Sequence, residues 1–373
     1  MWSSRYLKRL DLRMVVVIGA LMVVSLLVIS AQTMGGEEEL LSRKAWVQLR
    51  WFVIGGGVYV ACAGFDYTKL REATWILYAL TLVALMGLFF TRTVAGVHRW
   101  YVLPVVHVAV QPSEIAKLVV VLTLSWYLER ARAHAATWRT AVRASVIVGV
   151  PFLLILKQPD LGSAVVLWPI TMVMFYFGGV RPALLRGMLG FTLLGLVVVL
   201  SIFLGVVDHE GMRPLATKVM KDYQYERLNP NTHHQRAALV AIGSGGLTGA
   251  GWKKGEYSGR GWLPAAETDS VFPSFGEEFG LVGMALVLVL FYALIYFGFQ
   301  VTAVAKDHFG RLLSAGITVY LAMHVITNIA MMCGFLPVTG VPLVLVTYGG
   351  SSVLVTMAAL GILQSIYSRR FMF

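Results

Sequence analysis

Four carboxylates fall within twelve residues near position 270, and one of them is well placed for acid–base chemistry. Glu267 and Asp269 precede a long apolar run, and Glu277 and Glu278 lie at its start. Acidic side chains near a helix N-terminus stabilise the helix dipole, which is the interpretation we favour for Glu277 and Glu278. A carboxylate at the edge of an apolar bundle is desolvated, which raises its pKa toward the range useful for a general base. Asp269, beside Thr268, is therefore the candidate catalytic residue.

A charged pair lies inside another apolar segment. Pro112 suits the first turn of a helix, and Glu114 and Lys117 then lie about one turn apart on the same face. Two interpretations are compatible here: a buried structural ion pair, and a polar cavity, because charges within a membrane normally face the bundle interior or water. Arg99, which follows Gly96-Val97-His98, adds a cationic side chain just upstream.

Three further polar segments interrupt the apolar runs. The turn Pro159-Asp160-Leu161-Gly162 predicts Asp160 as a helix N-cap, and because a helix N-terminus attracts phosphate, Asp160 could also flank an anionic headgroup or a metal. Five glycines in nine residues surround Ser244, which favours either close approach to a ligand or a flexible connector. Ser351 and Ser352 follow two glycines, and this density favours a polar substrate surface over helix packing alone.

The histidines and cysteines give weaker signals. His233 and His234 are adjacent, which is poor spacing for joint metal ligation, so contact with headgroups or the surface is the favoured interpretation. His324 is expected to be a buried, hydrogen-bonded side chain. Cys62 and Cys333 fall within apolar segments, so neither a disulfide nor a zinc site is predicted.

The elements that must position these residues are apolar helices. Hydrophobic residues make up 58% of the chain and charged residues 13%, and the mean hydropathy is +0.74. Lipid cannot satisfy backbone N–H and C=O groups, so runs long enough to cross a core of ~30 Å must be helical. We predict an all-α integral membrane protein, a single polytopic membrane domain over 1–373 with a large extracytoplasmic loop at 208–276. Its ten transmembrane helices are expected at roughly 14–32, 45–65, 73–91, 112–129, 141–157, 161–179, 186–207, 277–304, 311–334 and 346–367.

The distribution of Lys and Arg predicts the orientation. Basic residues gather at both termini and in the loops of one face, beginning with Arg5 and Lys8 and ending with Arg369 and Arg370. The positive-inside rule then makes both termini cytoplasmic and places the polar segments on the outer side of the cytoplasmic membrane. This bias explains the net charge of +12, and the excess of basic residues suits contact with anionic membrane lipids. The basic residues form no continuous stripe, so no nucleic acid is expected as a partner.

Seven motifs resemble, in order and spacing, those of the SEDS family (shape, elongation, division and sporulation). They are Gly96…Arg99-Trp100, Gln111-Pro112-Ser113-Glu114…Lys117, Gln158-Pro159-Asp160-Leu161-Gly162, Ile242-Gly243-Ser244-Gly245-Gly246, Thr268-Asp269, Glu277-Glu278…Gly280 and Tyr348-Gly349-Gly350-Ser351-Ser352. The short termini and Tyr223-Gln224…Arg227 are more similar to the RodA branch than to the FtsW branch. The chain departs from the family pattern at Ala265, Ser270, Ala237-Ala238, Val344 and Thr347, which affects loop geometry and leaves Asp269 in place.

The resemblance implies a peptidoglycan glycosyltransferase that polymerises lipid II at the outer face of the membrane, for cell elongation and rod shape. It implies lipid II, the nascent glycan strand and a class B penicillin-binding protein, which is a transpeptidase, as partners. It also assigns the family's essential aspartate to Asp269. Residues expected to bind substrate are Arg99, Glu114, Lys117, Asp160, Ser244, Thr268, Ser351 and Ser352.

The expected reaction needs a donor that carries its own leaving group, because no nucleotide sugar is available outside the cell; a polyprenyl pyrophosphate meets that need. We expect Asp269 to take the proton of the acceptor sugar 4-hydroxyl while that oxygen attacks the anomeric carbon and inverts it. Lys117, Arg99 or a divalent cation (Mg or Mn) would stabilise the departing pyrophosphate. No organic cofactor is expected.

Two other functions compete with this one. A lipid II flippase or transporter predicts polar residues that continue to the cytoplasmic side and often internal repeats. The inner halves of the predicted spans are nearly uncharged, and the sequence shows no such repeat. A structural scaffold for cell-wall enzymes is the third alternative, and it would have no need of Asp269.

Overall fold

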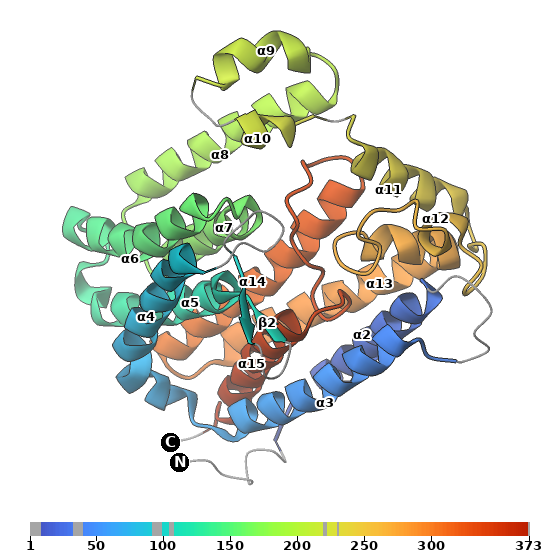
Figure 1. Ribbon diagram of the computed structural model, residues 1–373. Coiled ribbons are helices and arrows are strands. Elements are labelled where there is room, and N and C mark those ends of the chain that lie inside the picture. The colour runs from blue at the N-terminus through green and yellow to red at the C-terminus, as the bar shows by residue number, and fades with distance from the viewer. Residues whose placement is uncertain are drawn as a thin grey trace.

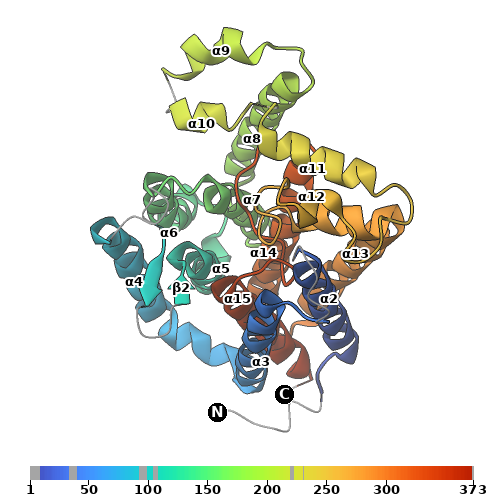
Figure 2. The ribbon, with the colours of Figure 1, turned by 45° about the vertical axis from the view of Figure 1, so that its right-hand side comes forward.

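Long helices packed side by side make up most of the protein, as Figures 1 and 2 show for the computed structural model. The structure describes residues 9–32, 40–91, 99–103, 108–218, 222–229 and 231–371, so the expectations for Arg5, Lys8 and Gly96-Val97-His98 lie outside the described residues. Within the described part, long helices coincide with all of the predicted segments. They are α2 (Leu12–Ala31), α3 (Arg43–Gly64), α4 (Leu70–Gly87), α5 (Pro112–Arg130), α6 (Trp138–Lys157), α7 (Leu161–Phe177), α8 (Pro182–Phe203), α13 (Val271–Val304), α14 (His308–Met332) and α15 (Gly350–Ser368).

Eight helices of the described part are long and apolar enough to cross a membrane. The two remaining long helices differ for identifiable reasons. Helix α7 is apolar but has only 17 residues, and α5 carries Glu114, Lys117, Glu129 and Arg130 within its 19 residues. Both helices pack against α14 inside the bundle, where neighbouring helices can surround polar groups.

Shorter elements fill the connections. The 3₁₀ turns are η1 (Tyr67–Lys69), η2 (Leu88–Phe90) and η3 (Arg132–His134), and the predicted loop 208–276 contains α9 (His209–Ala216), α10 (Asp222–Glu226), α11 (His233–Ser244) and α12 (Glu256–Gly259). Strands β1 (Tyr101–Leu103) and β2 (Val108–Val110) form an antiparallel hairpin with Tyr101 opposite Val110. The expectation of a purely helical chain is wrong at this connection, whose valines and tyrosine favour extended backbone.

Helix α14 is the centre of the bundle and α8 lies at its edge. Within their most apolar windows, 78% of the α14 residues are buried but only 6% of those of α8. Helix α8 leads to α9 and α10, which project from the bundle in both ribbon views (Figure 2). The two described ends of the chain meet, because the Asp11 N–H donates to Gln364 Oε1 at 2.9 Å and Gln364 Nε2 donates to the Asp11 carbonyl at 3.1 Å.

A kink divides α13 and fixes the loop before it. Gly280 interrupts the helix with φ 65°, and a Cβ there would lie 2.4 Å from the Gly249 nitrogen, so glycine is required for this close approach. Glu277 and Glu278 lie beyond the first turn of α13, which begins at Val271, so the helix-dipole interpretation of these residues is wrong. Their carboxylates instead accept backbone N–H groups of the 253–258 loop, including those of Tyr257 (2.7 Å), Ser258 (2.9 Å) and Gly255 (3.1 Å).

Candidate active site

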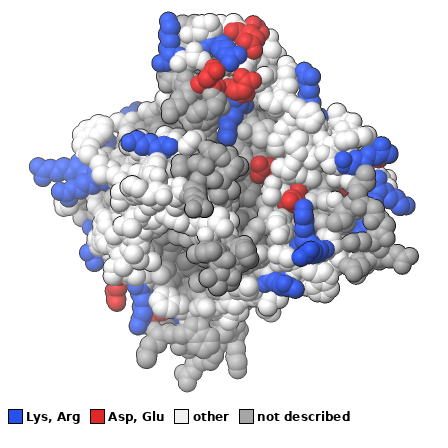
Figure 3. Space-filling model, in the orientation of Figure 1, with Lys and Arg blue, Asp and Glu red and all other residues white. Residues whose placement is uncertain are grey.

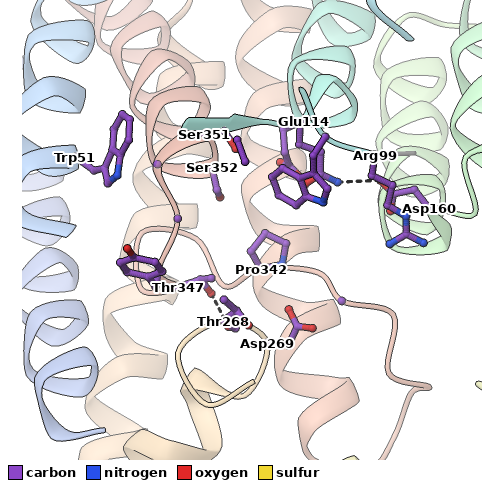
Figure 4. A pocket seen from close by; sticks show the side chains of 17 residues that line it. Trp51, Arg99, Glu114, Asp160, Thr268, Asp269, Pro342, Thr347, Ser351 and Ser352 are labelled. Carbon is purple, nitrogen blue, oxygen red and sulfur yellow. Dashed lines mark hydrogen bonds between the residues drawn. The ribbon is translucent and has the colours of Figure 1, made fainter. Parts of the chain in front are cut away.

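A cavity of about 480 Å³ collects most of the predicted site residues. It forms where the first turns of α5, α7 and α15 meet the segment before α13 and the segment after α14 (Figure 4). The predicted residues at its wall are Arg99, Glu114, Asp160, Thr268, Asp269, Ser351 and Ser352. Segments that are far apart in the sequence therefore build one polar site.

The backbone around Asp269 is held on both sides. Asn328 of α14 donates from Nδ2 to the Asp269 carbonyl at 3.0 Å and to the Val341 carbonyl at 2.8 Å. The Thr347 hydroxyl donates to the Thr268 carbonyl at 3.0 Å. These bonds use main-chain groups, so they fix the position of Asp269 without occupying its carboxylate, which lies at the cavity in Figure 4.

Burial changes the acidity of Asp269. Desolvation raises the pKa of its carboxyl group above the ordinary value, and the positive charges of Arg227 and Arg99 offset part of this effect. A raised pKa makes the ionised carboxylate a stronger proton acceptor. The structure thus gives Asp269 the environment expected of a general base.

Asp160 has the opposite electrostatic environment. It is the N-cap of α7, as predicted, and its Oδ1 accepts the Ser163 N–H at 3.3 Å. Its Oδ2 accepts Ser113 Oγ at 2.8 Å and Gln111 Nε2 at 3.0 Å. Burial opposes ionisation, but the Arg99 charge and these hydrogen bonds lower the pKa of Asp160 below its usual range. Asp160 is therefore an ionised group that organises the cavity wall and a poor proton acceptor.

Glu114 and Lys117 form the predicted buried ion pair. Lys117 Nζ donates to Glu114 Oε1 at 2.7 Å, and the two side chains are 1% and 3% exposed. His324 lies beside them as a buried, hydrogen-bonded side chain, which was expected. Its Nδ1 lies 3.1 Å from the Pro342 carbonyl and its Nε2 lies 2.8 Å from Lys117 Nζ, so Nδ1 donates and Nε2 accepts. Glu114 reaches the cavity wall, whereas Lys117 lies behind it.

Arg99 is the cation at the cavity wall that anchors a neighbouring turn. Its Nε donates to the Gln158 carbonyl at 3.2 Å, and a terminal nitrogen donates to the Pro159 carbonyl. The guanidinium therefore joins the segment before β1 to the turn between α6 and α7, where it also acts on Asp160.

Ser244 is the predicted site residue that lies elsewhere. It is the last residue of α11, and its hydroxyl donates to the Ala241 carbonyl at 2.9 Å. The start of the glycine-rich run is thus helical, and Gly245 and Gly249 approach the backbone of α13 so closely that a Cβ would overlap it. Close backbone packing against α13 accounts for Gly245 and Gly249.

The wall also contains residues that the sequence did not single out individually as binding residues, although most of them lie in the polar segments that it identified. They are Trp51, Trp100, Ala109, Gln111, Gly340, Pro342, Thr347, Tyr348, Gly349 and Gly350. Trp100, Gln111 and Tyr348 lie within the recognised motifs, so their proximity to charged neighbours was a usable signal. Trp51 belongs to α3, and no sequence signal pointed to it. Gly350 packs against Trp51, and a Cβ at position 350 would lie 2.4 Å from the indole ring.

The other polar residues give no metal site. Among the described residues, no three His, Cys, Asp or Glu side chains gather as metal ligands. His234 Nε2 lies 2.7 Å from Ser270 Oγ, next to Asp269 in the sequence, so this histidine contacts the site region.

Comparison with known proteins places this geometry in a family. Residues 6–370 match the profile of FtsW, RodA and SpoVE, described as a cell cycle protein. The chain belongs to the FtsW/RodA/SpoVE family. Within this family it is 34% identical to peptidoglycan glycosyltransferase MrdB of Escherichia coli K12, over 97% of this chain and 94% of that protein. It is 29% identical to peptidoglycan glycosyltransferase RodA of Treponema pallidum, over 94% and 96% of the two chains.

The RodA branch of the FtsW/RodA/SpoVE family fits the chain better than the FtsW branch. A probable peptidoglycan glycosyltransferase FtsW of Geobacter metallireducens is 30% identical but covers 85% of this chain. The fold is similar to the crystal structure of the rod shape determining protein RodA of Thermus thermophilus, with TM-score 0.67, 25% identity and 98% of each chain covered. It is also similar to a chain of a peptidoglycan synthase complex that coordinates polymerization and crosslinking, with TM-score 0.74, 24% identity and 98% and 99% of the two chains covered.

Proposed function

We propose that this chain is a peptidoglycan glycosyltransferase that polymerises lipid II into glycan strands for cell elongation and rod shape. The names of its MrdB and RodA relatives support this activity. The observation that carries the proposal is Asp269. Its carboxylate lies at the wall of a polar cavity, its own backbone is hydrogen-bonded in place, and burial raises its pKa.

The reaction is a single displacement at the anomeric carbon of the lipid-linked donor. The acceptor 4-hydroxyl oxygen attacks that carbon, its proton passes to Asp269, and the bond from the carbon to the pyrophosphate oxygen breaks with inversion. The pyrophosphate leaves with the polyprenyl chain. Arg99 lies at the cavity wall and is the cation we assign to the developing charge. Lys117, the other protein candidate, acts through Glu114 and His324 because its ammonium is committed to them.

A divalent cation, Mg or Mn, is the third candidate for charge stabilisation. The described residues offer no cluster of three ligands, and both oxygens of Asp160 already accept hydrogen bonds. Mg²⁺ is commonly held by one or two carboxylates together with substrate phosphates. We therefore propose that such a cation would depend on the donor's own pyrophosphate oxygens. It would add Lewis-acid stabilisation of the leaving group.

We further propose ten membrane spans, cytoplasmic termini and an extracytoplasmic 208–276 loop in the cytoplasmic membrane. Two observations support this topology: the described chain ends meet at Asp11 and Gln364, and the first turns of α5, α7 and α15 share one cavity. A reporter active only outside the cytoplasm should work when it is fused after Pro230 and should be silent after Arg132 or Phe373. Activity at either of the latter positions would invert the orientation and place the cavity on the wrong side.

A class B penicillin-binding protein is the proposed partner, since crosslinking must follow polymerisation. The competing function is a lipid II flippase or transporter. The two are separated by reconstituting the chain with its transpeptidase in vesicles that contain labelled lipid II. We expect long glycan products that appear only with externally accessible lipid II. Movement of lipid II across the bilayer without any glycan product would contradict the proposal and favour the flippase.

A further inference from the structure

A second large cavity lies at the opposite ends of the helices that frame the active site. Its volume is about 740 Å³, and it is formed by the end of α5, the η3 turn and the start of α6. The residues that line it are Trp126, Tyr127, Arg130, Ala131, His134, Thr137, Trp138, Arg139, Thr140 and Arg143. The active-site cavity contacts α5 at Glu114, near its other end. Nothing in the proposed reaction uses this second cavity.

The charge of this cavity is one-sided. Three arginines and a histidine line it, and its lining includes no Asp or Glu. Glu129 is the single acidic residue between Glu114 and Asp160 in the sequence, and it pairs with Arg71 at 2.8 Å. In Figure 3, basic side chains gather at the left edge of the molecule, where α6 lies in Figure 1. The cavity therefore presents a positive field suited to an anion.

Aromatic rings of the cavity wall stack on two guanidinium groups: that of Arg130, which lines the cavity, and that of Arg181, which does not. The Arg130 guanidinium lies 4.1 Å from the centroid of the Trp126 ring, and the Arg181 guanidinium lies 4.8 Å from that of Trp138. Stacking occupies the face of a guanidinium and leaves its edge N–H groups suited to phosphate oxygens. Trp and Tyr beside Arg are also the residues that prefer the boundary between lipid tails and water.

An apolar groove continues from this cavity along the bundle. Trp138 also lines a hollow of about 350 Å³, whose wall is formed along α6 by Ala141, Val142, Val146, Val150 and Leu153, with Leu184 of α8. Ser145, Gly149 and Leu184 connect this hollow to a third one of about 170 Å³ between α6, α7 and α8. A Cβ at Gly149 would meet nothing within 4 Å, so the groove is open there.

We propose that this composite surface binds a membrane phospholipid with an anionic headgroup. The phosphate lies in the basic cavity lined by Arg130, Arg139 and Arg143, and an acyl chain lies in the groove along α6. Basic pockets between membrane helices suit anionic lipid headgroups. The groove decides the ligand class, because a free phosphate has no apolar part to fill it. The inference concerns lipid binding and stands apart from the catalytic role of Asp269.

The test uses the full chain, purified in detergent and stripped of lipid. Phosphatidylglycerol, phosphatidylcholine and inorganic phosphate are titrated in parallel, and bound lipid is counted by native mass spectrometry. We expect preferential binding of phosphatidylglycerol. Arg139→Gln with Arg143→Gln should weaken it roughly thirtyfold, since each basic residue near anionic lipid contributes a factor of about five.

One control and one groove-blocking variant make the outcome specific. Lys69→Gln with Arg186→Gln removes the same charge from exposed positions that do not line the cavity, and should leave binding unchanged. Gly149→Trp fills the groove and should reduce phosphatidylglycerol binding; Val146→Trp blocks the same wall if Gly149→Trp does not fold.

Three results would overturn the proposal. Equal binding of phosphatidylcholine and phosphatidylglycerol would show that the surface does not select an anionic headgroup. Tight binding of inorganic phosphate that is indifferent to the groove variants would identify a phosphate site. An equal loss of phosphatidylglycerol binding in the Lys69 and Arg186 control variant would show diffuse electrostatic attraction, with no specific site at the cavity.

Discussion

Removing the Lys117 ammonium should destabilise the protein strongly. Its Nζ donates to Glu114 Oε1 at 2.7 Å and to His324 Nε2 at 2.8 Å, and the Lys117 and Glu114 side chains are 1% and 3% exposed. Lys117→Met keeps most of the apolar stem of the side chain but leaves the Glu114 carboxylate buried without its counter-charge. Loss of one partner of a buried ion pair costs about 3–5 kcal/mol.

The neutral double variant separates the pair from its surroundings. Glu114→Gln with Lys117→Met buries no net charge, so its loss of unfolding free energy should be smaller than the sum of the two single losses. Contacting residues commonly couple by about 0.5–3 kcal/mol. Thermal and denaturant unfolding of the four proteins in one detergent measures this coupling. Arg260→Met, which breaks the exposed Arg260–Glu256 pair, is the control and should cost about 1 kcal/mol or less.

Small effects of Glu114→Gln and Lys117→Met that simply add would show that the two charges are not a desolvated pair. The cavity wall would then be organised by Asp160 and Arg99 alone.

Three further predictions follow from the same geometry. The polymerisation rate should fall as the pH falls through the raised pKa of Asp269, while Asp160 stays ionised. This fall should occur at a higher pH than for an ordinary aspartate, whose pKa is about 3.9, and a rate that stays level down to pH ~4 would contradict it. Glu277→Gln should lower the free energy of unfolding by about 1.5–3 kcal/mol and have a much smaller effect on activity, because the Glu277 carboxylate accepts backbone N–H groups of the 253–258 loop. The exposed Glu256→Gln is its control, and an equal loss of stability in both variants would show that Glu277 does not hold this loop. Gly280→Ala should unfold at a lower temperature than wild type in thermal melts, because φ at position 280 is positive and the alanine Cβ would lie 2.4 Å from the Gly249 nitrogen. An unchanged melting temperature would mean that the kink relaxes freely.

Local sequence signals predicted the features that depend on a few neighbouring residues. Apolar length gave the long helices, Pro112 marked the start of α5, and the turn before α7 identified Asp160 as its N-cap. The i, i+3 spacing gave the Glu114–Lys117 pair, because helix geometry alone brings these side chains together.

Features that depend on tertiary packing could not be predicted in this way. The sequence does not show that α13 begins before Glu277, so the dipole interpretation failed where a distant loop supplies the hydrogen bonds. Ser244 shares a motif with glycines whose role is packing against α13, and its position at the end of α11 takes it away from the cavity. Trp51 reaches the cavity only because α3 packs against α15.

The polymerisation rate of Asp269→Asn tests the catalytic role of Asp269. This change keeps the shape and most hydrogen bonding of the side chain but removes its ability to accept a proton at neutral pH. Glu267→Gln is the matched control, since it neutralises a carboxylate two residues away that pairs with Lys44.

With labelled lipid II and the cognate transpeptidase, Asp269→Asn should polymerise about 10²–10⁴-fold more slowly than wild type. Lipid II binding and membrane insertion should persist, and Glu267→Gln should stay near the wild-type rate. A near wild-type rate for Asp269→Asn would remove Asp269 from the mechanism.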